Sequence, residues 1–210
     1  MTVNTLIFDF DGTLADSFEM IVRICNQLAK EFGYEIATDP EVNYYRNLSS
    51  RQIIKQSGVS FLHLPLLIRQ LKLKLNEEIH HLKPIAGIPE ALAALHNQGM
   101  RLGILTSNAR ENVEEFLHTH SLFQHFDFVY SGATLFGKNR VIRQCLKQQG
   151  LQLDQVAYVG DETRDIDAAR SLGIRSIAVG WGFNTPEVLV THYPDALINH
   201  PAELLTVKFG

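Results

Sequence analysis

Apolar and polar residues follow two different patterns along this chain. In residues 5–8 and from residue 84 onward, short apolar runs typical of buried strands alternate with segments in which apolar residues recur at helical spacing. The strands expected from the apolar runs are 5–8, 102–106, 126–130, 155–161 and 176–179, with a short edge strand at 196–198. The helices expected between them are centred on 88–95, 113–117, 141–146 and 166–172. This alternation predicts an α/β fold with a doubly wound parallel sheet, that is, a Rossmann-like core.

Residues 16–82 break this alternation, because they contain helical patterns without a clear strand. One apolar stripe runs from Phe18 to Phe32, and a second runs from Leu64 to Ile79 at nearly heptad spacing. In a short bundle such a stripe more often forms a core than a zipper with a partner. We therefore expect two domains: an α/β core domain of residues 1–15 and 83–210, and a small all-helical domain of residues 16–82.

Composition narrows the classes of function. The 210 residues, 45% of them hydrophobic, suffice for an α/β domain with a small insertion. A net charge of −4 without a basic stripe argues against a nucleic acid or a membrane surface as the main partner. Cys25 and Cys145 lie at apolar positions of predicted helices, so free thiols are expected. No signal-like or membrane-spanning apolar run is found, which favours a cytoplasmic location, and the oligomeric state is not predicted.

Acidic residues follow two of the predicted strands. Asp9 and Asp11 come directly after the run 5–8, and Asp161 ends the run 155–161. Two acids spaced by two residues point the same way from a strand, so their charges repel unless a cation lies between them or one carboxyl is protonated. An ordinary Asp-Gly turn would explain the first pair alone. Acids at two strand ends instead favour a site in which Asp9, Asp11 and Asp161 hold Mg²⁺.

Hydrogen-bond donors lie near the ends of two further strands. Thr106, Ser107 and Asn108 follow the run 102–106, and Lys138 stands after the run 126–130 at the start of a helix. A hydroxyl, backbone N–H groups and an ammonium are donors suited to phosphoryl oxygens. These residues are therefore expected to bind a phosphoryl group.

Four ordered segments together resemble the motifs of the haloacid dehalogenase-like phosphohydrolase superfamily. They are Asp9-Phe10-Asp11-Gly12-Thr13, Thr106-Ser107-Asn108, Lys138 and Gly160-Asp161-Glu162-Thr163-Arg164-Asp165. The chain is most similar to the phosphoglycolate phosphatase-like branch, because residues 11–17 run straight into a helix that ends at Phe32-Gly33. The resemblance implies an Mg²⁺-dependent phosphatase, in which residues 16–82 form a helical cap over the site.

The resemblance also implies a role for each motif residue. Asp9 would attack phosphorus and form an aspartyl-phosphate, and Asp11 would protonate the leaving oxygen. Thr106 and Lys138 would contact the transferred phosphoryl group. The remaining members would bind substrate or metal: Gly12, Thr13, Ser107 and Asn108 the substrate, and Asp161 and Asp165, with Asp9 and Asp11, the metal. Whether Asp165 or Glu162 touches the metal directly is left open.

The sequence leaves two alternative functions and the role of two arginines open. A phosphosugar mutase of the β-phosphoglucomutase type would share the fold, but the segment Glu19–Arg23 lacks the histidine usual in those relatives. A non-catalytic binding or regulatory relative would usually have lost the nucleophile or a metal acid, and none is missing here. Arg46 and Arg51, close to Lys55, are candidates to bind an anionic end of the substrate, and a solvated helix face explains them equally well.

Overall fold

The computed structural model describes residues 3–60, 62–132 and 137–207, and its centre is a six-stranded parallel sheet. The strand order is β3-β2-β1-β4-β5-β6. The strands are β1 (Thr5–Phe8), β2 (Arg101–Thr106), β3 (Phe128–Ser131), β4 (Val156–Gly160), β5 (Arg175–Val179) and β6 (Ala196–Ile198). The predicted α/β fold with a doubly wound parallel sheet is confirmed.

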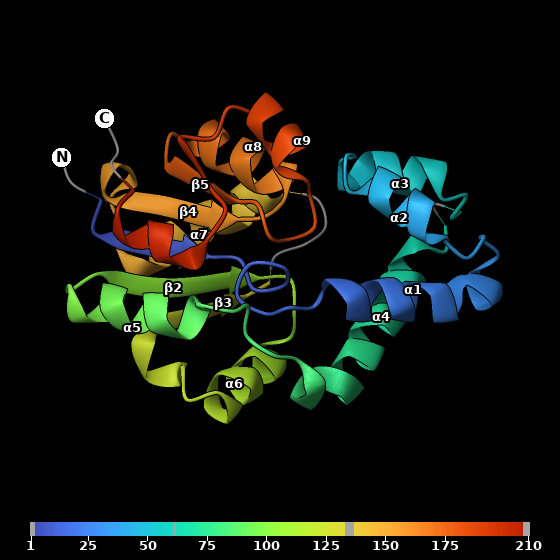
Figure 1. Ribbon diagram of the computed structural model, residues 1–210, viewed down its shortest axis with the longest axis horizontal. Helices are drawn as coiled ribbons and strands as arrows, with labels where there is room; N and C mark the ends of the chain where they lie inside the picture. Colours follow the sequence, from blue (N-terminus) through green and yellow to red (C-terminus); the bar gives the residue numbers. More distant parts are fainter. Residues whose placement is uncertain (1–2, 61, 133–136, 208–210) are drawn as a thin grey trace.

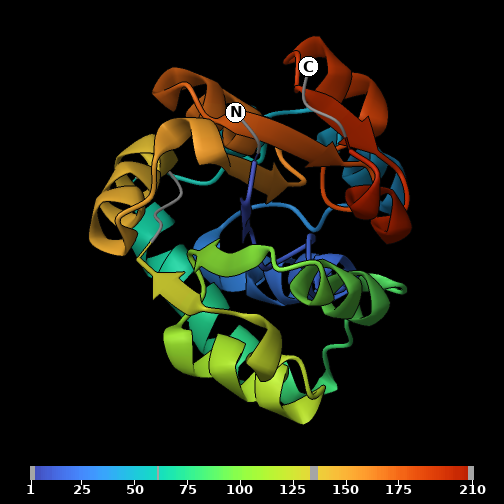
Figure 2. The ribbon, with the colours of Figure 1, turned by 90° about the vertical axis from the view of Figure 1, so that its left-hand side faces the viewer.

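Helices cover both faces of the sheet, as the continuous apolar runs of its strands require. The helices of this part are α5 (Ile88–Asn97), α6 (Arg110–Thr119), α7 (Lys138–Gln149), α8 (Thr163–Leu172) and α9 (Pro186–Thr191). On one face, α5 and α6 pack against Leu6 and Phe8 of β1. On the other, α7 and α8 pack against Ile7 of the same strand and Tyr158 of β4. Alternate residues of β1 thus enter opposite cores, and the sheet lies between two layers of helices (Figure 1, Figure 2).

Residues 16–82 form a helical insertion that lies to one side of the sheet (Figure 1). Its helices are α1 (Phe18–Phe32), α2 (Asp39–Tyr45), α3 (Ser50–Gln56) and α4 (Leu64–Glu78), followed by a short 3-10 turn, η1 (Ile79–His81). The two predicted apolar stripes pack against each other, because Ile24 and Leu28 of α1 share a hydrophobic cluster with Leu67 and Leu75 of α4. The insertion therefore has a small core of its own.

The chain leaves and re-enters the α/β part through two adjacent segments. Asp16 N–H donates to Lys83 O at 2.9 Å, and Ile85 N–H donates to Leu14 O at 2.9 Å. These bonds lie where the sequence predicts the domain boundary. Residues 1–2, 133–136 and 208–210 of the predicted core domain lie outside the described residues. None of the helices in the described part of the chain is long and apolar enough to cross a membrane.

Candidate active site

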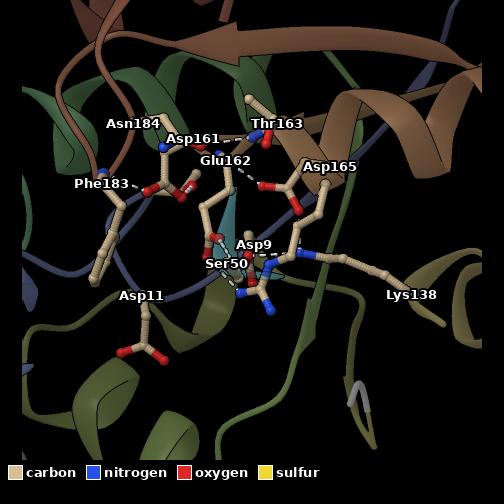
Figure 3. A network of polar contacts seen from close by, with 12 residues as sticks. Asp9, Asp11, Ser50, Lys138, Asp161, Glu162, Thr163, Asp165, Phe183 and Asn184 are labelled. Atoms are coloured by element: carbon tan, nitrogen blue, oxygen red, sulfur yellow. Dashed lines mark hydrogen bonds and ion pairs between the residues drawn. The ribbon is translucent and has the colours of Figure 1, made fainter. Parts of the chain in front are cut away.

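Three carboxylates and one ammonium meet at the carboxyl edge of the sheet. One carboxylate oxygen each of Asp9, Asp161 and Asp165 lies within 4.8 Å of the others, and all three residues are buried. Lys138 Nζ donates to Asp9 Oδ2 at 2.6 Å and also forms an ion pair with Asp165 (Figure 3). The residues come from the ends of β1 and β4 and from the starts of α7 and α8, so the parallel sheet brings segments 129 residues apart into contact.

The charge of Lys138 is fixed by its acidic neighbours. Burial alone would lower the pKa of this ammonium, but the charges of Asp165 and Asp9 hold the pKa well above its ordinary value. The ammonium also lies 5.0 Å from the centre of the Tyr158 ring. Lys138 is therefore a permanently charged donor beside Asp9 Oδ2.

Asp161 has a different environment from the other two acids. Its Oδ1 accepts from the Thr13 hydroxyl at 2.8 Å, and its Oδ2 accepts from Phe183 N–H at 2.7 Å. Burial raises the pKa of this carboxyl well above its ordinary value, and the charges of Glu162, Asp165 and Asp9 add to the shift. A cation would relieve this repulsion, and three carboxylates offer the hard oxygen donors that a divalent metal prefers. The acidic cluster thus fits a divalent cation.

Glycines let the backbone approach these acids closely. A Cβ atom at Gly12, which has φ of +74°, would overlap Asp161 Oδ2 and the Phe183 ring. A Cβ at Gly160 would overlap the Asp165 carboxylate. The Asp-Gly and Gly-Asp pairs of the sequence are therefore needed for space as well as for the turn.

Asp11 is half-buried, and the structure places its carboxylate outside this cluster (Figure 3). Asn108 Nδ2 donates to Asp11 Oδ2 at 3.2 Å. Burial and the nearby charge of Asp9 raise the pKa of Asp11 to about 6. Strand β1 ends at Phe8, so the alternation rule used to place Asp9 and Asp11 side by side does not extend to them. Its position beside Asn108 suits a proton donor, and its assignment as a metal ligand stays a prediction.

The residues after β2 organise the side of the site near Asp11. Thr106 is buried, and its Oγ1 accepts from Asn108 N–H at 3.0 Å. Asn108 Oδ1 accepts from Ala109 N–H at 2.8 Å, so this side chain satisfies the start of α6 while its amide reaches Asp11. Ser107 lies between them and is half-buried.

The two arginines predicted to bind substrate lie in different places. Arg46 donates from Nη2 to Gly182 O at 2.9 Å and from Nε to Phe183 O at 3.2 Å, so it contacts the loop after β5. Arg51 is exposed on α3 and lines a cavity of about 550 Å³ together with Lys138 and Arg164. Arg46 thus contacts the loop after β5, whereas Arg51 lies on the side of the site near Lys138.

The sequence interpretation missed the contribution of residues 182–185 and of Arg164. The loop contacts Asp161 through Phe183, and Arg164 forms an ion pair with Glu162. Both lie at carboxyl ends of strands in the same sheet, β5 and β4. The rule that located Asp9 and Asp161 could therefore have located the loop, had it been applied to the strand ending at Val179.

The all-parallel sheet, with carboxylates from two neighbouring strands and a lysine at its carboxyl edge, has the arrangement of an enzyme of the α/β class, in which active sites lie at this edge. The chain belongs to the haloacid dehalogenase-like hydrolase family, whose model matches residues 6–179. The predicted family and the hydrolase class are thus confirmed.

Similar proteins cover nearly the whole chain. A protein named phosphoglycolate phosphatase from Synechococcus elongatus is 38% identical over 203 residues, which are 97% of this chain and 96% of that protein. A protein of the same name from Aliivibrio fischeri is 28% identical over 225 residues, with 98% and 96% covered. Among solved structures, a haloacid dehalogenase-like hydrolase from Streptococcus pneumoniae shares the fold, with a TM-score of 0.79, 22% identity and 97% of each chain covered.

Proposed function

We propose that this protein is a phosphatase that hydrolyses a small phosphorylated metabolite, with 2-phosphoglycolate as the first substrate to test. The observation that carries the proposal is the buried set of Asp9, Lys138, Asp161 and Asp165 at the carboxyl edge of the sheet. The name of the relative at 38% identity supports the choice of substrate.

In the proposed reaction Asp9 attacks phosphorus and the bond to the leaving oxygen breaks, which gives an aspartyl-phosphate. Water then attacks this intermediate, the bond between phosphorus and Asp9 breaks, and the free carboxylate returns. Lys138 Nζ donates to Asp9 Oδ2 at 2.6 Å and Phe10 N–H donates to Asp9 Oδ1 at 2.9 Å, so both oxygens of the nucleophilic carboxylate are held in place. The Thr106 hydroxyl donates to a phosphoryl oxygen, and its own oxygen is held by Asn108 N–H.

Asp11 is the proposed acid and base. It gives its proton to the leaving oxygen in the first step and takes a proton from the attacking water in the second. A pKa of about 6, raised by burial and Asp9, suits a carboxyl that must carry a proton in one step and lose it in the next. Asn108 holds this carboxyl in place.

Asp9, Asp161 and Asp165 are the residues proposed to hold Mg²⁺. When bound, the ion would neutralise charge on the phosphoryl group. Thr13 and Phe183 orient the Asp161 carboxylate for this role, because each donates to a different oxygen. Lys138 keeps the Asp165 carboxylate directed toward Asp9.

We further propose that residues 16–82 act as the cap, and that the cavity beside Lys138 receives the rest of the substrate. Arg51 of the cap and Arg164 line this cavity, so it favours a second anionic group such as a carboxylate. Arg46 contacts the loop after β5 instead, and we assign substrate binding to Arg51. The proposed location is the cytoplasm.

The proposal is tested with the purified protein, Mg²⁺ and a panel of 2-phosphoglycolate, pyrophosphate, a sugar phosphate, a nucleoside monophosphate and an aryl phosphate. We expect the highest kcat/KM for 2-phosphoglycolate. Asp9→Asn removes the nucleophilic charge and should lower kcat by about three powers of ten or more, while the thermal midpoint stays close to that of the wild type.

Asp154→Asn, at an exposed position, is the matched control and should keep full activity. Turnover by Asp9→Asn near that of the wild type would refute the nucleophile. A tenfold preference for pyrophosphate or the sugar phosphate would refute the proposed substrate and leave the phosphatase class standing.

A further inference from the structure

The loop of residues 182–185, here called the docking loop, joins the α/β part to the cap. It follows β5 and contacts residues 46–48, which lie between α2 and α3. Besides the two bonds from the Arg46 guanidinium, Thr185 N–H donates to Arg46 O at 3.1 Å. The Thr185 hydroxyl donates to Asn47 Oδ1 at 2.8 Å. The cap is thus held at this point through both side chains and backbone carbonyls.

Asn184 lies at the centre of this contact and is only 4% exposed. Its Nδ2 donates to Arg46 O at 2.9 Å and to Leu48 O at 3.0 Å. Its Oδ1 accepts from Thr163 N–H, the first residue of α8, at 2.9 Å (Figure 3). One buried amide therefore uses both donors on the cap and its oxygen on the helix that carries Asp165. The three partners fix the orientation of the amide.

The opposite side of the docking loop contacts Asp161. Phe183 N–H donates to Asp161 Oδ2, and Asn184 N–H donates to Asp161 O at 3.2 Å. Four consecutive residues thus touch the cap on one side and an acid of the cluster on the other. A second bond, from the Ser50 hydroxyl to Glu162 Oε2 at 2.8 Å, joins the same two parts nearby (Figure 3).

We propose that Asn184 is a positioning residue that holds the cap against the edge of the sheet that carries Asp161 and Asp165. Without its amide, the carbonyls of Arg46 and Leu48 would lose a buried donor and would favour an undocked cap, in which water satisfies them. The hydrogen bonds of the Asn184 side chain go to Arg46, Leu48 and Thr163, so it acts through the cap and through α8. The kinetic part of the test below rests on the proposed phosphatase function, and the exchange part does not.

Asn184→Asp separates the two roles of the amide. The new carboxylate keeps an acceptor for Thr163 N–H, but it replaces the donor to the cap with an oxygen that faces two carbonyls. Hydrogen–deuterium exchange of peptides that cover residues 39–56 should become at least about tenfold faster, while peptides of β1 and β2 keep the wild-type rate. Asn184→Ala, measured alongside, removes the amide without adding charge and should act in the same direction.

Asn199→Asp is the matched control, because it adds the same charge at an exposed position after β6. It should leave exchange unchanged everywhere in the cap. Wild-type exchange of residues 39–56 in both Asn184 variants would overturn the proposal. An equal increase in all peptides would also overturn it, because it would show a general loss of stability.

The kinetic readout distinguishes a positioning role from a structural one. Asn184→Asp should raise KM for a substrate with a second anionic group about tenfold, and should leave kcat for a small aryl phosphate within about twofold of the wild type. An equal fall in kcat for both substrates would place the effect at the acidic cluster and refute the role of Asn184 in the cap. If the wild type lacks phosphatase activity, the proposed function fails, and the exchange result still decides the role of Asn184.

Discussion

The three buried acids of the cluster have unequal partners. Asp9 and Asp165 share the ammonium of Lys138, whereas the Asp161 carboxylate accepts only from Thr13 and Phe183 in the described residues. A buried carboxylate without a cationic partner is costly to ionise, which explains the raised pKa of Asp161. The negative charge of Asp161 is therefore not neutralised, and a bound metal ion would stabilise the ionised site most on this side.

Asp11 gives the first prediction. Asp11→Asn keeps the shape of the side chain but cannot donate a carboxyl proton. We expect kcat to fall at least about a hundredfold for an alkyl phosphate and less than about tenfold for an activated aryl phosphate, whose leaving oxygen needs little protonation. Steady-state kinetics on both substrates measures this difference. Equal losses would mean that Asp11 does not serve the leaving group, and Asp16→Asn at an exposed position provides the comparison.

The charged residues of the site could be recognised from the sequence. Asp9 and Asp161 directly follow apolar runs that form strands, and Lys138 and Asp165 lie at the starts of helices. The direction of a side chain beyond a strand end could not, as Asp11 illustrates. Nor could the neutral partner Asn184, because its importance comes from three bonds to distant segments and not from a local pattern.

Among the elements, the sheet was more predictable than the cap. Each predicted strand is present. The bounds of β2, β4 and β5 differ by one residue at one or both ends, and the largest shift is at β3, where the expected 126–130 becomes Phe128–Ser131. A short 3-10 turn, η2 (Phe123–His125), comes before it, and Asp127 accepts from Leu102 N–H instead of extending the strand. Helices α2 and α3 have no buried residues, so hydrophobic periodicity could not reveal them. Their starts are instead stabilised by the capping boxes Thr38–Glu41 and Ser49–Gln52.

A further prediction concerns Asp195, whose side chain connects the beginning of β5 to the turn before β6. Its oxygens accept from Arg175 Nη1 at 2.7 Å and from Ser176 N–H at 2.9 Å. Burial would raise the pKa of this carboxyl, but these hydrogen bonds outweigh burial and hold the pKa below its ordinary value. The ionised form is thus favoured in the folded state. Its stabilising effect is complete above the unfolded pKa of about 3.9 and is lost as pH falls through the lower folded pKa.

The free energy of unfolding of the wild type should therefore exceed that of Asp195→Asn at pH 6, and the difference should shrink as pH is lowered to 3. Urea unfolding of both proteins at each pH measures this. Asp154→Asn, at an exposed acid, should show a smaller dependence. A difference that stays constant over this range would contradict the role of Asp195.

For the whole molecule, the sheet order places β1 between β2 and β4 and so brings Asp9 and Asp161 to one edge. The two helical layers could be inferred from alternating strands and helices, because such units have few stable arrangements. The position of the cap could not be inferred in the same way. It depends on bonds between residues 46–50 and the edge of the sheet, which no periodicity encodes.

Metal binding gives a prediction for the whole molecule. A cation that binds only the folded state raises its stability by about 2.7 kcal/mol when its concentration is a hundred times the Kd. We therefore expect Mg²⁺ to raise the thermal midpoint of the wild type by roughly 5–10 °C, and a chelator to reverse the rise. Asp161→Asn should abolish this shift, and Asp195→Asn should retain it. Differential scanning fluorimetry measures these midpoints. An undiminished rise of the thermal midpoint in Asp161→Asn would place the cation elsewhere.

The central place of β1 has a consequence for synthesis on the ribosome. Thr5 pairs with Arg101 on one side and with Val156 on the other, so both partners of this strand emerge long after it does. At about 5–20 residues per second, an apolar strand waits several seconds or more before its first neighbour is made. The helices of residues 16–82 emerge in between and can bury their own apolar stripes during that time. The helices of residues 16–82 can thus pack together early, and Asp9 meets Asp161 only when about three quarters of the polypeptide has been translated.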